Sequence, residues 1–444
     1  MKSILLIFIT ILILASLNIS AQSEKLLSVK HMQKDIDQLL AVVDAHPDPF
    51  SHIGEEEFLN HFKELKKEFK KPLSRIEFYK RAATQIALIK DGHSSVHMPR
   101  FWMDGKRKQN GALPFKVFMS NQDELFVQKQ FKEIDIPVGS KITHINDMSV
   151  ADFITAIDPW ISYEKKRFRN TIIDDQFELY LYLVIGKSDG LSFTYESAET
   201  KRVVIENMSY KDWKAADKLN REEREGLGIG RPYEYEQVSE GVGIIKIYSF
   251  LSSDIDDYDR FLKKTFESIK EDEIHSLIID VRGNYGGQPK IASKLFHYLT
   301  DSPFKGVARS SMKVSKAQRE YYYERYPQLR MKEYILQRRE GDLDFDAIMR
   351  NEIGTYTIED GYHNELPKTR KYEYNGDLYL LTNRDSYSAA STFASTFQCY
   401  QMGTIIGEET GGTKIFRANA IWIKLKNSAF YVGMSTTNVR VCLL

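Results

Sequence analysis

Ser388 stands where a serine could act as a nucleophile, between a short apolar run and the start of a helical pattern. Residues 378–381 contain no polar break and predict a strand buried on both faces. Small and apolar residues recur at helical spacing from Ala389 onward, so a helix is expected to begin near Ser388. Free backbone N–H groups and the positive end of the helix dipole meet at such a point and can stabilise an oxyanion. The alternative is that Ser388 is only an N-cap, since serine is a preferred capping residue.

His93 is a candidate general base in the N-terminal part of the chain. A predicted helix covers residues 74–89, begins with a capping-box pattern from Ser74 to Glu77, and is expected to end at Gly92. His93 then lies on the connection that leaves this helix. A histidine with an ordinary pKa of about 6.5 can accept a proton at neutral pH. The alternative is a loop histidine that is exposed or structural.

A glycine-rich loop at residues 283–287 is the third chemical feature. It follows an apolar run at 277–280, which predicts a buried strand, and so lies at the strand end where α/β folds place their ligands. The loop has neither the Lys-Ser/Thr ending of a nucleotide loop nor the spacing of a dinucleotide fingerprint. We therefore reject a phosphate-binding function for it.

The elements that must position these residues divide the chain into several parts. The expected parts are a signal peptide at 1–21, a helical domain at 22–105, a β-rich domain at 106–206, and an α/β core at 207–444 with an insertion or lid at 300–375. The core begins with a polar linker at 207–235. The fold class is therefore α/β and multidomain.

Finer patterns support this division. In the β-rich domain, residues 113–118, 124–127 and 201–205 read as strands. In the core, a strand at 243–247 and helices at 255–270 and 291–299 alternate with the run at 277–280. An alternation of this kind implies parallel strands joined by helices.

Composition and the first residues bound the class and location of the protein. The 444 residues include 62 Lys plus Arg and 62 Asp plus Glu, so nothing points to a nucleic-acid partner. Lys2, the apolar run at 4–17 and Ala21 form the pattern of a secretory signal peptide, which predicts export to a periplasmic or extracellular compartment. An uncleaved N-terminal membrane anchor is the alternative. Cys399 and Cys442 are too few for a disulfide framework.

Two segments resemble one protease family in the same order. The sequence LIIDVRGNYGG at 277–287 is similar to the glycine loop of the C-terminal processing (tail-specific) proteases. The sequence TNRDSYSAA at 382–390, followed by GEETGG at 407–412, is similar to that family's nucleophile region. Residues 136–147 resemble part of a PDZ-like domain, which many members carry, and DGHS at 91–94 resembles the tricorn-core-like branch.

The resemblance implies a crotonase-like βαβ protease core that hydrolyses peptide bonds, with Ser388 rather than Ser386 as nucleophile. The oxyanion is then held by the backbone N–H of Ala389 and one from Gly286 or Gly287. The tricorn-like branch takes its base from the N-terminal part of the chain, which fits His93. In the processing branch the base is a lysine near Thr413, and the offset Lys414 fits poorly.

The third catalytic residue and the competing functions stay open at this stage. In the tricorn-like branch an orienting glutamate lies beyond the point at which this chain ends, and Glu408 and Glu409 are candidates by composition only. The leading function is an exported serine endopeptidase that acts on peptides or unfolded proteins without a cofactor. The alternative is a catalytically impaired relative, with a truncated C-terminus, that binds peptides or other ligands. No metal site is expected, because His93 and His97 lack the helical glutamate motif of metalloproteases.

Overall fold

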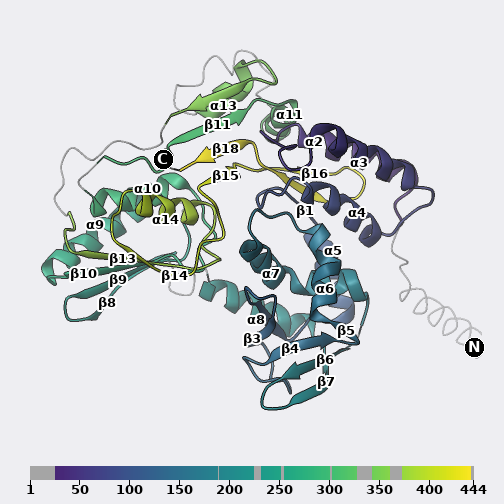
Figure 1. Ribbon diagram of the computed structural model, residues 1–444, viewed down its shortest axis with the longest axis horizontal. Coiled ribbons are helices and arrows are strands. Elements are labelled where there is room, and N and C mark those ends of the chain that lie inside the picture. Colours follow the sequence, from purple (N-terminus) through teal and green to yellow (C-terminus); the bar gives the residue numbers. More distant parts are fainter. Residues whose placement is uncertain are drawn as a thin grey trace, which may run out of the picture.

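The computed structural model describes residues 26–188, 190–224, 232–251, 255–300, 303–327, 343–360 and 373–441. The predicted signal peptide, Cys442 and parts of the predicted insertion lie outside these ranges. Within them, no helix is both long and apolar enough to cross a membrane. Figure 1 shows one sheet with its helices on one side of the molecule, a second sheet below the N-terminal helices on the other, and C-terminal strands running between the two.

The predicted helical character of the N-terminal domain is confirmed. Its elements are α2 (Val29–Val43), α3 (Glu55–Glu68), α4 (Arg75–Ala87), β1 (Ser95–His97) and α5 (Arg100–Asn110). The Ser74 hydroxyl accepts a hydrogen bond from the backbone N–H of Glu77 and so caps α4 as expected. Helix α4 ends at Ala87, before Gly92 is reached, so Gly92 does not end this helix.

The β-rich domain contains the predicted strands around an unpredicted long helix. Its elements are β2 (Phe115–Met119), β3 (Leu125–Gln130), β4 (Lys141–Ile145), β5 (Met148–Ser149), α6 (Val150–Ile157), η1 (Asp158–Trp160), α7 (Lys166–Ile185), β6 (Gly190–Glu196) and β7 (Thr200–Glu206). The strands pair in the order β2-β3-β4-β6-β7, with β5 beside β4. Helix α7 buries residues on several of its sides, which removes the periodic apolar stripe that predicts a surface helix.

The α/β core is built on a sheet in the order β14-β13-β10-β9-β8. Its elements are β8 (Tyr233–Ser239), β9 (Val242–Ile247), α9 (Ile255–Glu271), β10 (Ser276–Asp280), α10 (Pro289–Leu299), β13 (Asp377–Thr382), α14 (Ala389–Cys399) and β14 (Thr404–Gly407). The pairs β9–β10, β10–β13 and β13–β14 are parallel, as predicted. Residues 210–224, predicted to lie in a linker, form helix α8 (Tyr210–Arg224).

The core sheet is covered by helices on one face, contrary to the prediction that residues 378–381 are buried on both. Leu378 and Leu380 pack with α9, α10 and α14, whereas Tyr379 and Leu381 on the other face are only partly buried. Strands β9, β10, β13 and β14 follow one another across the sheet in a single direction. Right-handed crossovers in one direction place all connecting helices on the same face. Figure 1 shows α9, α10 and α14 together against the sheet.

The insertion and the C-terminal residues share one antiparallel sheet. The insertion supplies β11 (Arg309–Lys313), α11 (Lys316–Arg325), α13 (Leu343–Arg350) and β12 (Tyr356–Glu359), and the C-terminal residues supply β15 (Ile415–Ala418), β16 (Ile421–Lys424), β17 (Tyr431–Met434) and β18 (Thr437–Arg440). The sheet order β12-β11-β18-β15 joins the two regions, while β16 pairs with β17, and β17 pairs with β1 near the N-terminus. The described part of the insertion is therefore integrated into the fold.

The hydrophobic cores cross the predicted domain boundaries. One cluster of buried side chains contains the N-terminal helices, the β-rich domain and residues such as Ile421, Phe430 and Val432 from β16, β17 and their connection. A second cluster holds the core sheet and its helices. Residues 421–434 were expected inside the α/β core but pack with the N-terminal half, because β17 pairs with β1.

Asp35 ties this C-terminal hairpin to α2. Its buried carboxylate accepts hydrogen bonds from the backbone N–H groups of Asn427 and Ser428, at 3.0 and 2.6 Å. We expect Asp35→Ala to lower the free energy of unfolding by about 3 kcal/mol, since both N–H groups lose their acceptor in a buried site. Urea denaturation measures this change. The control is Asp37→Ala on the same helix, which removes only an exposed ion pair with Lys66 and should cost about 1 kcal/mol or less. Equal losses in the two variants would contradict the prediction.

Candidate active site

Ser388 occupies a strained turn between β13 and α14. Its backbone has φ 52° and ψ −119°, a region that side chains other than glycine rarely adopt. Its side chain makes no capping hydrogen bond to the helix that follows. A capping serine has extended backbone angles and accepts a bond from the first turn. Of the two interpretations of Ser388, the geometry therefore disfavours the N-cap, and such strain is frequent at functional sites.

Ser386 serves a different purpose, two residues earlier. It is fully buried, and its Oγ donates to the carbonyl of Val281 at 2.7 Å. Its backbone carbonyl accepts from the Ser391 hydroxyl at 2.8 Å. Ser386 thus fixes the turn against strand β10 and its following loop.

The glycine loop lies directly against the turn that carries Ser388. The Gly283 N–H donates to Asn383 Oδ1, and the Tyr387 N–H donates to the carbonyl of Asn284, each at 3.0 Å. Gly286 has φ +102°, and a Cβ there would lie 2.7 Å from the Cβ of Ser388. Only glycine allows this approach. The two sequence motifs predicted to cooperate are thus brought into contact.

The backbone N–H groups near Ser388 differ in whether they already donate a hydrogen bond. The Gly286 N–H donates to Asn284 Oδ1 at 2.8 Å and is engaged. The N–H groups of Gly287 and Ala389 have no hydrogen-bond partner among the described residues. Gly287 and Ala389 also line the same cavity as Ser388. Of the predicted oxyanion donors, Ala389 and Gly287 are therefore available and Gly286 is not.

A cavity of about 950 Å³ brings the N-terminal and C-terminal parts of the site together. Ser388 and His93 both line it, together with apolar side chains that include Leu251, Val307 and Phe416. Such a volume suits a segment of peptide or a ligand of similar size. Within the part of the chain that the structure describes, no hydrogen bond joins Ser388 to His93.

Tyr387 contacts the His93 ring at its Nδ1 atom. Its Nδ1 lies 2.9 Å from the Tyr387 hydroxyl, and the two rings stack with centroids 4.7 Å apart. Its Nε2 is buried and has no hydrogen-bond partner among the described residues. Burial lowers the pKa of His93 below its usual value, and the negative charge of Asp91 partly offsets this. The ring is therefore biased toward its neutral form, which a general base requires.

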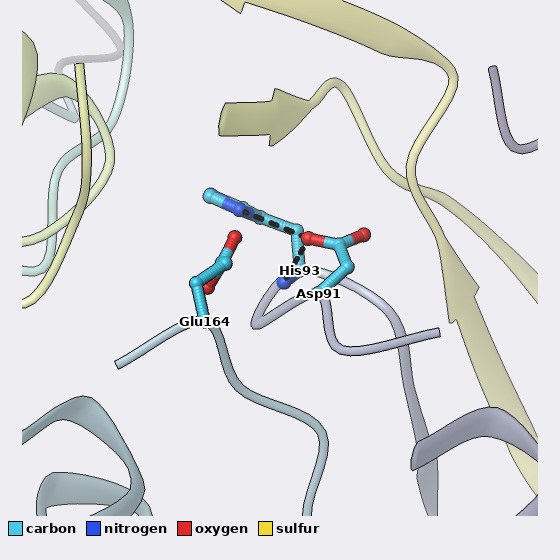
Figure 2. A group of neighbouring side chains, drawn as sticks. All are labelled: Asp91, His93 and Glu164. Carbon is cyan, nitrogen blue, oxygen red and sulfur yellow. Dashed lines mark hydrogen bonds and ion pairs between the residues drawn. The ribbon is translucent and has the colours of Figure 1, made fainter. Parts of the chain in front are cut away.

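Asp91, His93 and Glu164 form a compact cluster (Figure 2). One side-chain oxygen or nitrogen atom from each residue lies within 4.8 Å of those of the other two, a spacing that could hold a metal ion. The three groups already have partners. Asp91 accepts from the Ser94 hydroxyl at 2.5 Å and from the His93 backbone N–H at 3.0 Å, and Glu164 Oε2 accepts from the Gly92 N–H at 3.0 Å. We interpret the cluster as a hydrogen-bonded support for the loop that carries His93.

The pKa values of the two carboxyl groups in this cluster are shifted in opposite directions. Burial opposes the charge of Asp91, but hydrogen bonds from His46 and Ser94 and the nearby histidines hold its pKa well below its usual range. Burial, reinforced by the negative charge of Asp91, raises the pKa of Glu164 to about 8. Asp91 is therefore the anion of the cluster, and Glu164 is largely neutral below that pH.

The predicted orienting glutamates do not reach His93. Glu408 and Glu409 are exposed and do not line the cavity. The Glu409 carboxylate pairs with Lys165 Nζ at 2.5 Å, and Glu408 Oε2 accepts from the backbone N–H of Arg384 at 3.4 Å. Lys414 is likewise exposed and outside the cavity lining. Glu408 thus supports the turn at Arg384, and Glu409 pairs with side chains at the start of α7, so neither is bonded to His93.

Comparison with known proteins bears on this geometry. Residues 241–431 match the family model described as peptidase family S41. The chain carries a peptidase S41 domain. This match confirms the resemblance to the C-terminal processing proteases that the two sequence motifs suggested. No curated protein sequence matches the chain significantly.

Two solved structures have a fold similar to that of this chain over most of its length. Mature CPAF aligns with 13% identity and a TM-score of 0.62, covering 93% of this chain and 89% of its own. Mature CPAF complexed with lactacystin aligns with 14% identity and a TM-score of 0.58, covering 93% and 90%. At these identities the likeness shows the fold alone, an α/β multidomain protease fold.

The peptidase S41 domain contains only part of the candidate site. The match includes Ser388, Ala389 and the glycine loop, while His93 and Glu164 lie before its first residue, Gly241. The site therefore depends on the N-terminal and β-rich domains as well. Arg384, in the segment between β13 and Ser388, makes a second connection: its buried guanidinium pairs with Asp174 on α7.

Three residues of the site were not predicted from the sequence. No motif singles out Tyr387, which lies between two serines, or Glu164, which lies in an irregular segment before α7. Gly92 was assigned to a helix end, yet a Cβ there would lie 2.5 Å from the Tyr387 hydroxyl oxygen. The position of Tyr387, directly before the candidate nucleophile Ser388, is the signal that the sequence offered.

The raised pKa of Glu164 predicts a specific pH dependence of stability. Its folded-state pKa of about 8 exceeds the ordinary 4.5, so its stabilising contribution is complete below 4.5 and is lost as the pH rises through about 8. We expect the thermal midpoint of the wild type to fall more steeply between about pH 5 and about pH 9 than that of Glu164→Gln. Differential scanning fluorimetry at both pH values measures this. Glu409→Gln, at an exposed ion pair, is the control and should follow the wild type. Identical slopes for wild type and Glu164→Gln would contradict the prediction.

Proposed function

We propose that the protein is an exported serine endopeptidase of the tricorn-like branch, with Ser388 as nucleophile and His93 as general base. The observation that carries the proposal is the strained, uncapped Ser388, in contact with the glycine loop and facing the cavity that His93 also lines. A peptidase domain around Ser388 supports the same reaction class. The substrate class is a peptide or an unfolded protein segment. Export rests on the signal-peptide pattern of the first 21 residues.

The proposed reaction proceeds in two acyl-transfer steps. As Ser388 Oγ bonds to the carbonyl carbon of the substrate, its proton passes to His93 Nε2 and the carbonyl oxygen becomes an oxyanion. The C–N bond then breaks, the amine takes the proton from His93 and leaves, and an ester on Ser388 remains. Water attacks this ester and gives a proton to His93. The ester C–O bond breaks, Ser388 regains its proton and the carboxylic acid departs.

The N–H groups of Gly287 and Ala389 are the proposed oxyanion donors. Both lack partners among the described residues and flank Ser388 in the cavity. Donors fixed in advance stabilise the developing negative charge at no cost in reorganisation. Ser388 and His93 are not hydrogen-bonded here, and catalytic hydrogen bonds often tighten only when substrate binds. The proposal therefore includes a small approach of the two side chains in the substrate complex.

The organisation of the remaining chain follows from this proposal. Residues 106–206 act as a PDZ-like unit beside the active site, and the described part of the insertion contributes Val307, Ser310 and Glu359 to the cavity wall as a cover over the substrate. The core at 207–444 supplies the nucleophile and oxyanion donors. The N-terminal domain supplies the base.

Hydrolysis of fluorescently quenched casein by the purified chain tests the proposed function. Activity should be present in the wild type, absent in Ser388→Ala, and retained in Lys414→Ala, whose side chain lies outside the cavity. Ser386→Ala is a matched serine control, and its activity should follow the fraction of folded protein. Folded wild type that neither hydrolyses casein nor reacts with a fluorophosphonate probe would overturn the proposal and favour a binding function.

A further inference from the structure

The hydroxyl of Tyr387 contacts the Nδ1 atom of the His93 ring. The Tyr387 Oη lies 2.9 Å from His93 Nδ1, and the rings stack at an interplanar angle of 26°. Phe168 stacks on the other side of Tyr387, with centroids 3.6 Å apart and an angle of 10°. Tyr387 is buried, so its hydroxyl has a defined position. The base is thus held by a rigid aromatic stack.

Among the described residues, no carboxylate is hydrogen-bonded to His93 Nδ1. The closest oxygen of Asp91 is 3.9 Å from His93 Nδ1, beyond hydrogen-bond distance, and the same oxygen accepts the backbone N–H of His93. In a Ser–His mechanism the residue on Nδ1 fixes the tautomer, because Nδ1 must carry the proton if Nε2 is to accept one. The Tyr387 hydroxyl is therefore the group that decides the tautomer.

The hydroxyl hydrogen of Tyr387 needs an acceptor of its own if its oxygen is to accept from His93. Glu164 lies beside it: a Cβ on Gly92 would be 2.5 Å from Tyr387 Oη and 2.8 Å from Glu164 Oε2. Glu164 Oε1 is buried and has no partner within the described ranges. A carboxyl group keeps an acceptor oxygen whether or not it is protonated. Burial, with the nearby Glu164 and Asp91, raises the pKa of Tyr387 well above its usual value, which keeps the hydroxyl neutral.

We propose that Tyr387 is a positioning residue for His93: its oxygen accepts the Nδ1–H, and its own hydrogen is directed to Glu164. His93 Nε2 is then left with a free lone pair. The inference rests on the proposed function, since it explains how His93 serves as the base. One turn of the chain carries both the nucleophile, Ser388, and the residue before it that orients the base. A tyrosine hydroxyl takes the place of the carboxylate of a Ser-His-Asp triad.

The test replaces Tyr387 with phenylalanine, which keeps the aromatic stack and removes only the hydroxyl. We expect the rate of labelling by a fluorophosphonate probe to fall at least about 10-fold, the equivalent of one lost hydrogen bond to the base. Long-range ¹H–¹⁵N correlation spectra, with His93 assigned by its absence in His93→Ala, report the tautomer directly. The wild type should carry the proton on Nδ1, and Tyr387→Phe should shift toward the Nε2-protonated form.

Tyr195→Phe is the matched control, because Tyr195 is also buried, donates its hydroxyl to the carbonyl of Asp135 at 2.8 Å, and does not line the cavity. It should label at close to the wild-type rate. Wild-type labelling and tautomer unchanged in Tyr387→Phe would overturn the positioning role while leaving the proposed function intact. No labelling of the wild type, or undiminished labelling of His93→Ala, would instead overturn the proposed function. If Tyr387→Phe fails to fold, a wild-type spectrum with the proton on Nε2 would still overturn the inference.

Discussion

Replacement of His93 by alanine is expected to lower the rate of casein hydrolysis by about 10³-fold or more. The reason is that the Ser388 hydroxyl loses the group that accepts its proton. His93 lines the cavity and is held against the turn that carries Ser388, where the Tyr387 hydroxyl lies 2.9 Å from His93 Nδ1. Initial rates on quenched casein, normalised to folded protein by thermal midpoint, measure the loss.

His97 provides the matched control for this prediction. It follows His93 closely, lines the same cavity and is partly buried, and this burial lowers its pKa to about 4. Its Nε2 is already bonded to the Ser95 hydroxyl at 2.8 Å, and its ring packs edge-on against Trp422. His97→Asn should therefore retain most of the activity. A larger loss in His97→Asn than in His93→Ala would contradict the assignment of the base.

Gly287→Ala is expected to reduce hydrolysis by about 10²-fold or more, the usual effect of losing one oxyanion donor. Gly287 has φ +138°, and a Cβ there would lie 2.4 Å from the carbonyl carbon of Phe250. The loop must shift to admit the methyl group, and the shift moves the Gly287 N–H away from Ser388. Hydrolysis rates and urea denaturation of the same samples separate this effect from simple instability.

Gly283→Ala is the control within the same loop. Gly283 also has a positive φ, +73°, but a Cβ there meets nothing within 4 Å. The substitution should cost about 1–2 kcal/mol of stability through backbone strain and leave the folded protein active. Equal losses of activity per folded molecule in the two variants would remove the special role of Gly287.

Local patterns in the sequence were sufficient for the elements around the nucleophile. The apolar runs at 277–280 and 378–381 and the helical spacing after Ser388 correspond to β10, β13 and α14. Adjacent strands with their following turns must meet at one sheet edge, so the contact between the glycine loop and Ser388 could be predicted. That helices cover only one face of this sheet could not be predicted. It depends on the order of the strands in the sheet, and no single run of residues indicates that order.

The side chains that hold His93 in place could not be predicted from the sequence for a related reason. Tyr387 and Glu164 reach it from segments separated in the chain by hundreds and by tens of residues, as the structure brings α7, β1 and the nucleophile turn together. The pairing of β1 with β17 is equally long-range, and it moves residues 421–434 into the N-terminal core. Periodicity and turn signals report local conformation, whereas such contacts are decided by tertiary packing.

The most direct test of the account is the position of a covalent adduct. The purified chain is incubated with a fluorophosphonate probe, digested, and analysed by tandem mass spectrometry, with Ser388→Ala treated in parallel. The account predicts a single phosphonylated site at Ser388, absent from the variant. An adduct on Ser386, or none on well-folded wild type, would contradict it.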